Sequence, residues 1–191
     1  MRMENSFDVP ASPETTWELL MDVPRVIPCM PGATLDQVVD EQTWKATMQV
    51  KLGPIGLTFA TDVTREEADE DAHRVKLAAS AREVRNRGNA NATIESTLVG
   101  VNGGTHVDLV TELALTGTVA QYGRGMIQDI SSQLVDSFAR CLQTQLLAAP
   151  EEAERAVAAQ ETPVAGLSLF FGGLRRRAKS LVKRAAGLIR R

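Results

Sequence analysis

The side chains that could ligate a metal or act as nucleophiles are few in this chain and far apart in sequence. Its two cysteines, Cys29 and Cys141, share no close spacing. We therefore expect neither a zinc site nor a disulfide, and predict that both are small buried hydrophobes. His73 lies in an acidic segment and His106 begins a predicted strand, and neither has a metal-like partner nearby in sequence. The sequence predicts no metal site and no catalytic residue set.

Two further patterns are weak signals for chemistry. Gly123-Arg124-Gly125 lacks the flanking residues of a phosphate loop, and a dinucleotide fold would need a parallel sheet. Arg82, Arg85 and Arg87 surround one predicted turn and are expected to form a solvated edge, with a docking surface as the alternative. Tyr122 is the only tyrosine. Its hydroxyl could donate to a ligand carbonyl, or could simply reach water from the core.

A long helix from Gly117 to Ala149 is expected to position such groups. Its apolar side chains recur every four residues and form a broad stripe, and Pro150 ends the pattern. A helix of about thirty residues is roughly 45 Å long. Another part of the fold, of comparable extent, must cover the apolar stripe of this helix.

The hundred residues before this helix read mainly as strands. Met3–Val9 alternates as a first strand, and Ser12-Pro13 is a typical helix start. Residues 22–32 hold three prolines, which allow a short helix and then a rigid turn. Six two-faced strand patterns follow, separated by turn signals. We predict an α+β fold, in which a curved antiparallel sheet of about seven strands wraps around the long C-terminal helix and two short helices follow the first strand.

A cavity between sheet and helix is expected because many positions that should line it are small. The alternative is a tightly packed core with close approach of helix and sheet. The small positions are Ala79, Ala81, Ala90, Ala92, Ser96, Gly123 and Gly125.

Four segments resemble a known family. They are PASPETTWELLMDVPRVIPCMPG (10–32), MQVKLGPIGLTF (48–59), RGNANATIESTL (87–98) and ELALTGTVAQYGRGMIQDISSQLVDSF (112–138). The chain resembles the START-like helix-grip superfamily and, within it, the CoxG proteins of the molybdenum-containing carbon monoxide dehydrogenase system. The resemblance implies an accessory protein that helps bring the dehydrogenase to the membrane and that has a hydrophobic ligand cavity. Relatives also accompany other molybdenum hydroxylases, so the substrate of the partner enzyme stays open.

From this resemblance we expect a non-enzymatic protein with no covalent cofactor. The expected ligand is a lipophilic molecule, a quinone of the menaquinone or ubiquinone type, because a soluble dehydrogenase needs a membrane electron acceptor. A small cyclase- or hydrolase-like enzyme and a purely structural tether are the alternatives. The candidate pocket-lining residues are Trp44, Met48, Phe59, Leu109, Leu113, Tyr122, Gly125 and Met126.

Charge is divided unevenly along the chain. Residues 1–161 carry 13 basic and 24 acidic side chains, a net charge of −11, whereas residues 162–191 carry eight basic and no acidic ones. We predict a ligand-binding domain over 1–149, a flexible linker over 150–166 and a basic amphipathic helix over 167–191.

No apolar signal-peptide core begins the chain, and the longest uncharged run near its end, 162–174, is too short to span a bilayer. The expected location is the cytoplasm, peripheral on the cytoplasmic face of the cell membrane.

The basic segment has the pattern of a helix lying in a membrane interface, with phenylalanines on one side and Lys or Arg on the other. Its expected target is the anionic inner leaflet, and the acidic body argues against nucleic acid. A partner protein's groove and a solvated tail are the alternatives. The candidate membrane-binding residues are Phe170, Phe171, Leu174, Arg175, Arg176, Arg177, Lys179, Leu181, Lys183 and Arg184.

Overall fold

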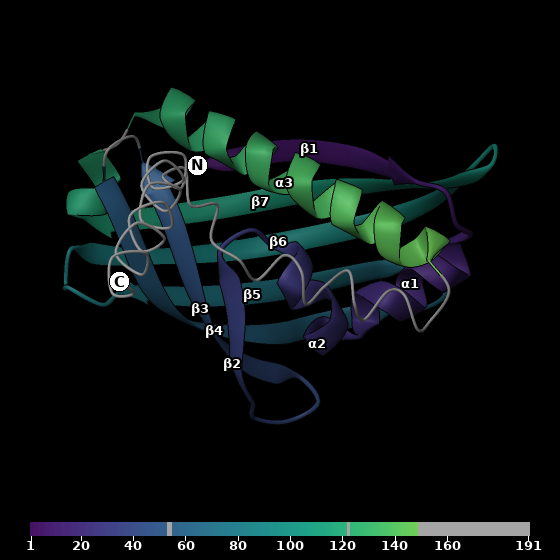
Figure 1. Cartoon of the computed structure of the whole chain (residues 1–191), viewed down its shortest axis with the longest axis horizontal. Helices are drawn as coiled ribbons and strands as arrows, with labels where there is room; N and C mark the ends of the chain where they lie inside the picture. The colour runs from purple at the N-terminus through teal and green to yellow at the C-terminus, as the bar shows by residue number, and fades with distance from the viewer. Residues whose placement is uncertain (53–54, 122, 149–191) are drawn as a thin grey trace, which may run out of the picture. The chain divides into compact units, whose positions relative to one another are not determined.

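The computed structural model describes residues 1–52, 55–121 and 123–148. Seven antiparallel strands form one sheet in the order β1-β7-β6-β5-β4-β3-β2. The sheet curves beneath one long helix, α3, and two short helices lie near that helix's carboxyl end (Figure 1). The predicted helix-grip fold is confirmed. The elements are β1 (Arg2–Val9), α1 (Pro13–Met21), α2 (Val23–Val26), η1 (Ile27–Cys29), β2 (Ala33–Val38), β3 (Thr43–Leu52), β4 (Ile55–Asp69), β5 (Arg74–Glu83), β6 (Gly88–Val101), β7 (Gly104–Gly117), η2 (Thr118–Gln121) and α3 (Arg124–Leu147).

The start of α1 follows the sequence signal. Ser12 has an extended backbone, and its hydroxyl accepts a hydrogen bond from the Thr15 N–H at 3.3 Å. Pro13 occupies the first turn, where a missing N–H costs nothing. The helix buries Trp17 and Leu19 against the sheet and its neighbours.

The pairing register fixes which side chains share the concave face. One row of side chains, which lie opposite one another on adjacent strands, consists of Ala46, Thr61, Ala81 and Ala90. The next row on the same face consists of Trp44, Val63, Ala79 and Ala92. Successive residues of a strand alternate between faces, so the intervening polar residues lie on the convex face. The two-faced patterns predicted for these strands are confirmed in β3 to β7. Pairing of β4 with β5 continues past an irregularity at Arg65/Glu67 to Asp69.

The long helix is shorter at its amino end than the predicted Gly117–Ala149. Gly117 has a φ of +70°, and a Cβ there would lie 2.7 Å from the Gly88 Cα. A short 3₁₀ turn, η2, follows, and Gly123 caps α3 with an extended backbone. Helical spacing alone could not show this break, because Tyr122 continues the apolar repeat.

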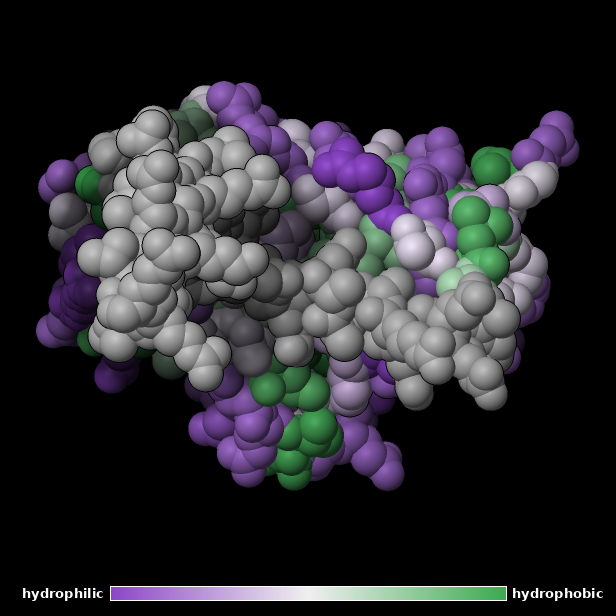
Figure 2. Space-filling model, in the orientation of Figure 1, coloured by the Kyte–Doolittle hydropathy of each residue, from purple (hydrophilic) through white to green (hydrophobic). Residues whose placement is uncertain are grey.

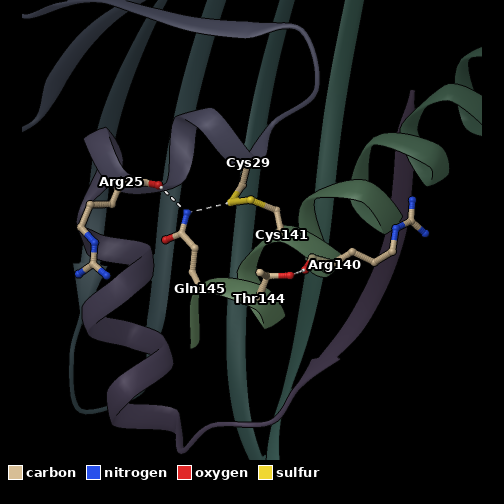
Figure 3. Close-up of a disulfide and its surroundings, with 6 residues drawn as sticks. All are labelled: Arg25, Cys29, Arg140, Cys141, Thr144 and Gln145. Carbon is tan, nitrogen blue, oxygen red and sulfur yellow. Dashed lines mark hydrogen bonds between the residues drawn. A yellow bond between two sulfur atoms is a disulfide. The ribbon is translucent and has the colours of Figure 1, made fainter. Parts of the chain in front are cut away.

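A disulfide joins Cys29 of η1 to Cys141 of α3, with a Cα–Cα distance of 5.3 Å (Figure 3). The expectation of two unpaired cysteines was therefore wrong. A sequence separation of 112 concealed the contact, which forms because the fold lays η1 beside the carboxyl half of α3. Gln145 supports this junction, since its amide donates to the Arg25 carbonyl at 3.2 Å and lies 3.1 Å from the Cys29 sulfur.

Three packed clusters form the core. One surrounds the disulfide and includes Leu142 and Val9. A second packs Trp17 of α1 over Leu98 and Val107. The third lies at the other end of the sheet, around Leu57, Phe59 and Val119. Packed clusters thus occupy both ends of the concave face, with α3 in the disulfide cluster at one end and η2 in the third cluster at the other.

Candidate functional site

The middle of the concave face lies between these packed ends. Val63, Ala79, Ala92 and Leu113 face one another across four adjacent strands. All four are half-buried, and none belongs to a packed cluster. Apolar side chains that are half-covered in this way offer a surface to an apolar ligand.

The path of α3 explains why this region is less covered. The helix runs close to β1 and η1, whereas no extended backbone approach to β3, β4, β5 or β6 occurs among the described residues. On the side of α3 that packs inward, Ile127 and Leu134 stay half-buried, while Leu142 in its carboxyl half is fully buried. The helix therefore closes one end of the concave face more completely than the middle.

The structure brings several predicted pocket residues to this face and gives them different roles. Trp44 is 3% exposed, and the Arg65 guanidinium lies 5.6 Å from its ring centre. Phe59 belongs to a packed cluster with Met48 beside it. Leu109 and Leu113 are half-buried on β7. Among these predicted residues, Leu113 therefore contributes accessible apolar surface to the middle of the concave face, whereas Phe59 is packed inside a cluster.

The predicted residues near the start of α3 lie elsewhere. Gly125 is exposed and, by helical spacing, lies on the side of α3 opposite Ile127 and Leu142. Met126 is 43% exposed. Tyr122 falls outside the described residues, as do all the candidate membrane-binding residues from Phe170 to Arg184.

A buried carboxylate that sequence reasoning missed lies at one end of the concave face. Glu83 is 1% exposed. One carboxylate oxygen accepts from the backbone N–H groups of Arg85 and Arg87 at 2.8 and 3.2 Å, and the other accepts from the Arg87 guanidinium at 2.8 Å. The Arg87 hydrogen bond lowers the pKa of Glu83 to about 2, against the opposing effect of burial. Arg87, expected at a solvated edge, is thus part of an internal ion pair.

This ion pair serves the fold. Arg87 also donates to the Gly56 carbonyl at 2.8 Å, and the Thr118 N–H donates to the Arg87 carbonyl at 2.8 Å. The network joins β4, the β5–β6 turn and η2. Both oxygens of Glu83 already accept hydrogen bonds, so it offers no free general acid or base to a substrate.

Two hollows lie away from the middle of the concave face. One, of about 670 Å³, lies on the convex face around Asp62, Ser80, Asn91 and Glu112, and its lining also includes Ala79, Ala92 and Leu113. The other, of about 490 Å³, lies beside α1 between Trp17 and Arg65 and has a rim of Glu18, Glu66, Glu67 and Glu70. The acidic rim of the second hollow fits a lipophilic molecule less well than the concave face does.

Apolar side chains also gather over the β2–β3 hairpin (Figure 2), where Val38 and Val39 are 51% and 45% exposed. Val38 lies opposite Trp44, so this rim continues the concave face outward. β2 is also an edge strand, and its register shifts between Leu35 and Gln37. Such a shift disfavours pairing with another chain.

Within 1–52, 55–121 and 123–148, no group of three or more His, Cys, Asp or Glu side chains could hold a metal ion. Over the same ranges, no helix combines the length and apolar character needed to cross a bilayer.

Comparison with solved structures relates the chain to proteins of one fold. A conserved protein from Geobacillus kaustophilus matches with a TM-score of 0.69 and 19% identity, over 76% of this chain and 95% of that one. Norcoclaurine synthase from Thalictrum flavum matches with a TM-score of 0.54 and 12% identity, over 78% and 87%. Zhui aromatase/cyclase from Streptomyces sp. R1128 gives 0.53 and 14%, over 85% and 99%. At these identities the likeness shows the fold alone.

No curated protein matches the chain in sequence. A family model does, over residues 6–147, which include all the elements from α1 to α3 and the second half of β1. The matched family is that of the carbon monoxide dehydrogenase CoxG proteins. The curved sheet, the long helix and the match over most of its length together place this chain in the CoxG family.

Proposed function

We propose that this chain is a non-enzymatic accessory protein of a molybdenum-containing carbon monoxide dehydrogenase, and that it carries a lipophilic ligand, a respiratory quinone, between the membrane and the enzyme. Membership of the CoxG family supports the accessory role. The observation that supports the ligand is the half-covered apolar row Val63, Ala79, Ala92 and Leu113 between two packed ends. A quinone has a long apolar tail that would suit this surface, and its head must leave the bilayer to be reduced by a soluble enzyme.

The test of the ligand begins with organic extraction of the purified protein and mass spectrometry of the extract. Binding of a short-chain quinone analogue is then measured by calorimetry. Ala92→Phe fills the middle of the concave face and should abolish binding, at an overpacking cost of about 1–3 kcal/mol that thermal unfolding would measure. Gly125→Leu is the matched control, because no atom lies within 4 Å of a Cβ there and the position is on the outer side of α3. If the extract contains no lipophilic molecule and the analogue does not bind, the proposed ligand is wrong and the protein is a purely structural tether.

We further propose that residues 167–191 attach the protein to the cytoplasmic leaflet. The pattern of Phe170, Phe171 and eight basic residues supports interfacial binding. Each basic residue contributes about 1 kcal/mol near an anionic surface, so binding should weaken with salt. The full chain should sediment with anionic liposomes, residues 1–149 should not, and a double change of Phe170 and Phe171 to Ser should weaken binding even at low salt. Equal sedimentation of both chains would leave a groove on the dehydrogenase as the target.

The alternative is a small enzyme, since the fold matches include an aromatase/cyclase and a synthase. Such an enzyme needs a free acid or base in its cavity. Glu83, the buried carboxylate of the described concave face, is engaged by Arg87 instead. Turnover of a polyketide-like substrate that survives Glu83→Gln but not Ala92→Phe would favour this alternative.

A further inference from the structure

The concave face carries seven polar side chains among the described strand residues, and most are occupied within the protein. Arg65 donates to the Met21 and Glu41 carbonyls at 3.4 and 2.9 Å. Thr105 donates to the Ala11 carbonyl at 2.7 Å, and Asn5 donates to the Ser131 hydroxyl at 3.2 Å. The full set is Asn5, Thr61, Arg65, Glu83, Ser96, Thr105 and Thr111.

Two hydroxyls of this set are buried and have no hydrogen-bond partner: Ser96 Oγ and Thr61 Oγ1. Ser96 is the more enclosed residue, with 7% of its surface exposed, whereas Thr61 as a whole is half-buried. Burying an unpaired hydroxyl costs free energy, so buried hydroxyls in folded proteins nearly always have a partner. An unpaired hydroxyl facing an apolar surface is therefore a candidate for contact with a bound molecule.

The register places Ser96 at one end of the half-covered surface. It lies between Val75 and Leu109 on neighbouring strands. Serine is smaller than both of these neighbours. Along β6, Ile94 and Ala92 lead from Ser96 into the middle of the face, and both are half-buried.

Thr61 marks the opposite end. Its row, with Ala81 and Ala90, lies three two-residue steps from the row of Ser96. At about 6.7 Å per step, the two hydroxyls are about 20 Å apart along the strands. That separation is too large for one compact polar head, so a single hydroxyl must hold the head while the chain occupies the apolar surface between.

We propose that the Ser96 hydroxyl donates a hydrogen bond to a carbonyl of the ligand's polar head, and that the apolar chain runs over Ala92 and Ala79 toward Thr61. The inference rests on the proposed lipophilic ligand and names its polar contact. Ser96 is favoured over Thr61 because it is more deeply enclosed and because its strand neighbours, Val75 and Leu109, belong to or pack against the Trp17 cluster. The ligand class is a long-chain molecule with a hydrogen-bond-accepting head.

The test compares Ser96→Ala with Thr61→Val, which removes the other unpaired hydroxyl at nearly constant shape. Two probes are titrated by calorimetry: a short-chain naphthoquinone and a naphthalene with the same chain but no carbonyls. Ser96→Ala should weaken naphthoquinone binding about 3- to 10-fold, the range for one lost neutral hydrogen bond, and should leave naphthalene binding unchanged. Thr61→Val should leave the affinity of both probes within about twofold.

Infrared spectroscopy of the bound naphthoquinone gives a second reading that does not depend on any variant. One carbonyl stretch should lie at lower frequency than in an apolar solvent, and the shift should vanish in Ser96→Ala. An unshifted carbonyl in the wild-type complex overturns the proposal even if Ser96→Ala fails to fold.

The outcomes separate two failures. No binding of either probe to the wild-type chain overturns the proposed ligand function and this contact with it. Binding that Ser96→Ala leaves unchanged overturns only the contact. A loss in Thr61→Val alone means that the head lies at the opposite end. A lower melting temperature of Ser96→Ala with unchanged binding means that the hydroxyl held an internal water, and this outcome also overturns the contact.

Discussion

Glu83 illustrates how a buried carboxylate can serve the fold. Its pKa is lowered to about 2, first by the Arg87 side chain and then by the backbone N–H groups of Arg87 and Arg85, while burial acts in the opposite direction. The ordinary value is 4.5. A lowered pKa contributes stability that is complete above the unfolded-state value and is lost as the pH falls toward the folded-state value.

Glu83→Gln should therefore lower the melting temperature at pH 7, because a neutral amide replaces the charged acceptor of three hydrogen bonds. The difference from wild type should narrow between pH 4.5 and about 2, where the native carboxylate also takes up its proton. Thermal unfolding followed by circular dichroism measures both effects. Glu67→Gln, at an exposed ion pair, is the control and should change little. A difference in melting temperature between wild type and Glu83→Gln that does not change with pH would contradict the ionic role of Glu83.

His106 offers a second pH-dependent contact, on the convex face. A hydrogen bond with Asp8 at 2.7 Å raises the pKa of His106, burial lowers it, and the charge of Asp108 adds to the rise. A raised pKa gives stability that is present below the ordinary value of 6.5 and is lost as the pH rises through the folded-state value. Asp8→Asn should lower the NMR titration midpoint of His106, whereas Asp36→Asn, at the far edge of the sheet, should not. An unchanged midpoint in Asp8→Asn would contradict the assigned cause.

Among the elements, the carboxyl half of α3 and the η1 segment depend on each other through Cys29–Cys141. The disulfide closes a loop of more than a hundred residues, and a native disulfide is typically worth about 2–4 kcal/mol. Reduction should therefore lower the urea midpoint of the wild-type chain, and a variant with serine at both positions should be insensitive to reductant. Two free thiols in protein purified without reductant, with no effect of reduction on stability, would contradict the bridge.

The same bridge bears on the proposed location. Disulfides are rare in the reducing cytoplasm. Quantifying free Cys29 and Cys141 thiols in rapidly acid-quenched cells would report the state of the bridge where the protein works. A reduced pair is the result expected for the cytoplasmic face of the membrane.

At the scale of the whole molecule, residues 1–149 should fold alone as a soluble monomer. All three packed clusters and the end of α3 lie within residues 1–148. Circular dichroism and size-exclusion chromatography of this fragment measure the outcome. A fragment that ends at residue 135 is the control and should not fold, because it lacks Phe138, Cys141 and Leu142 of the disulfide cluster. Aggregation of the longer fragment would show that the domain boundary is wrong.

The sequence by itself determined the order and faces of most elements. The strict alternation of Trp44, Ala46 and Met48 predicts that these side chains share one face of a strand. Ser12-Pro13 predicts the start of a helix, because serine caps a helix and proline fits its first turn. These are local properties, which depend on neighbours in the chain. The family also followed from contiguous segments, such as residues 10–32 and 112–138.

Only the tertiary structure decided which distant side chains meet. Cys29 reaches Cys141 across 112 residues, and Glu83 becomes buried because η2 and β4 close over the β5–β6 turn. Ser96 reads in sequence as one more small residue. It becomes distinctive because its neighbours on adjacent strands, Val75 and Leu109, leave its hydroxyl buried without a partner. Spacing along one strand carries no information about these contacts, because the register between strands sets them.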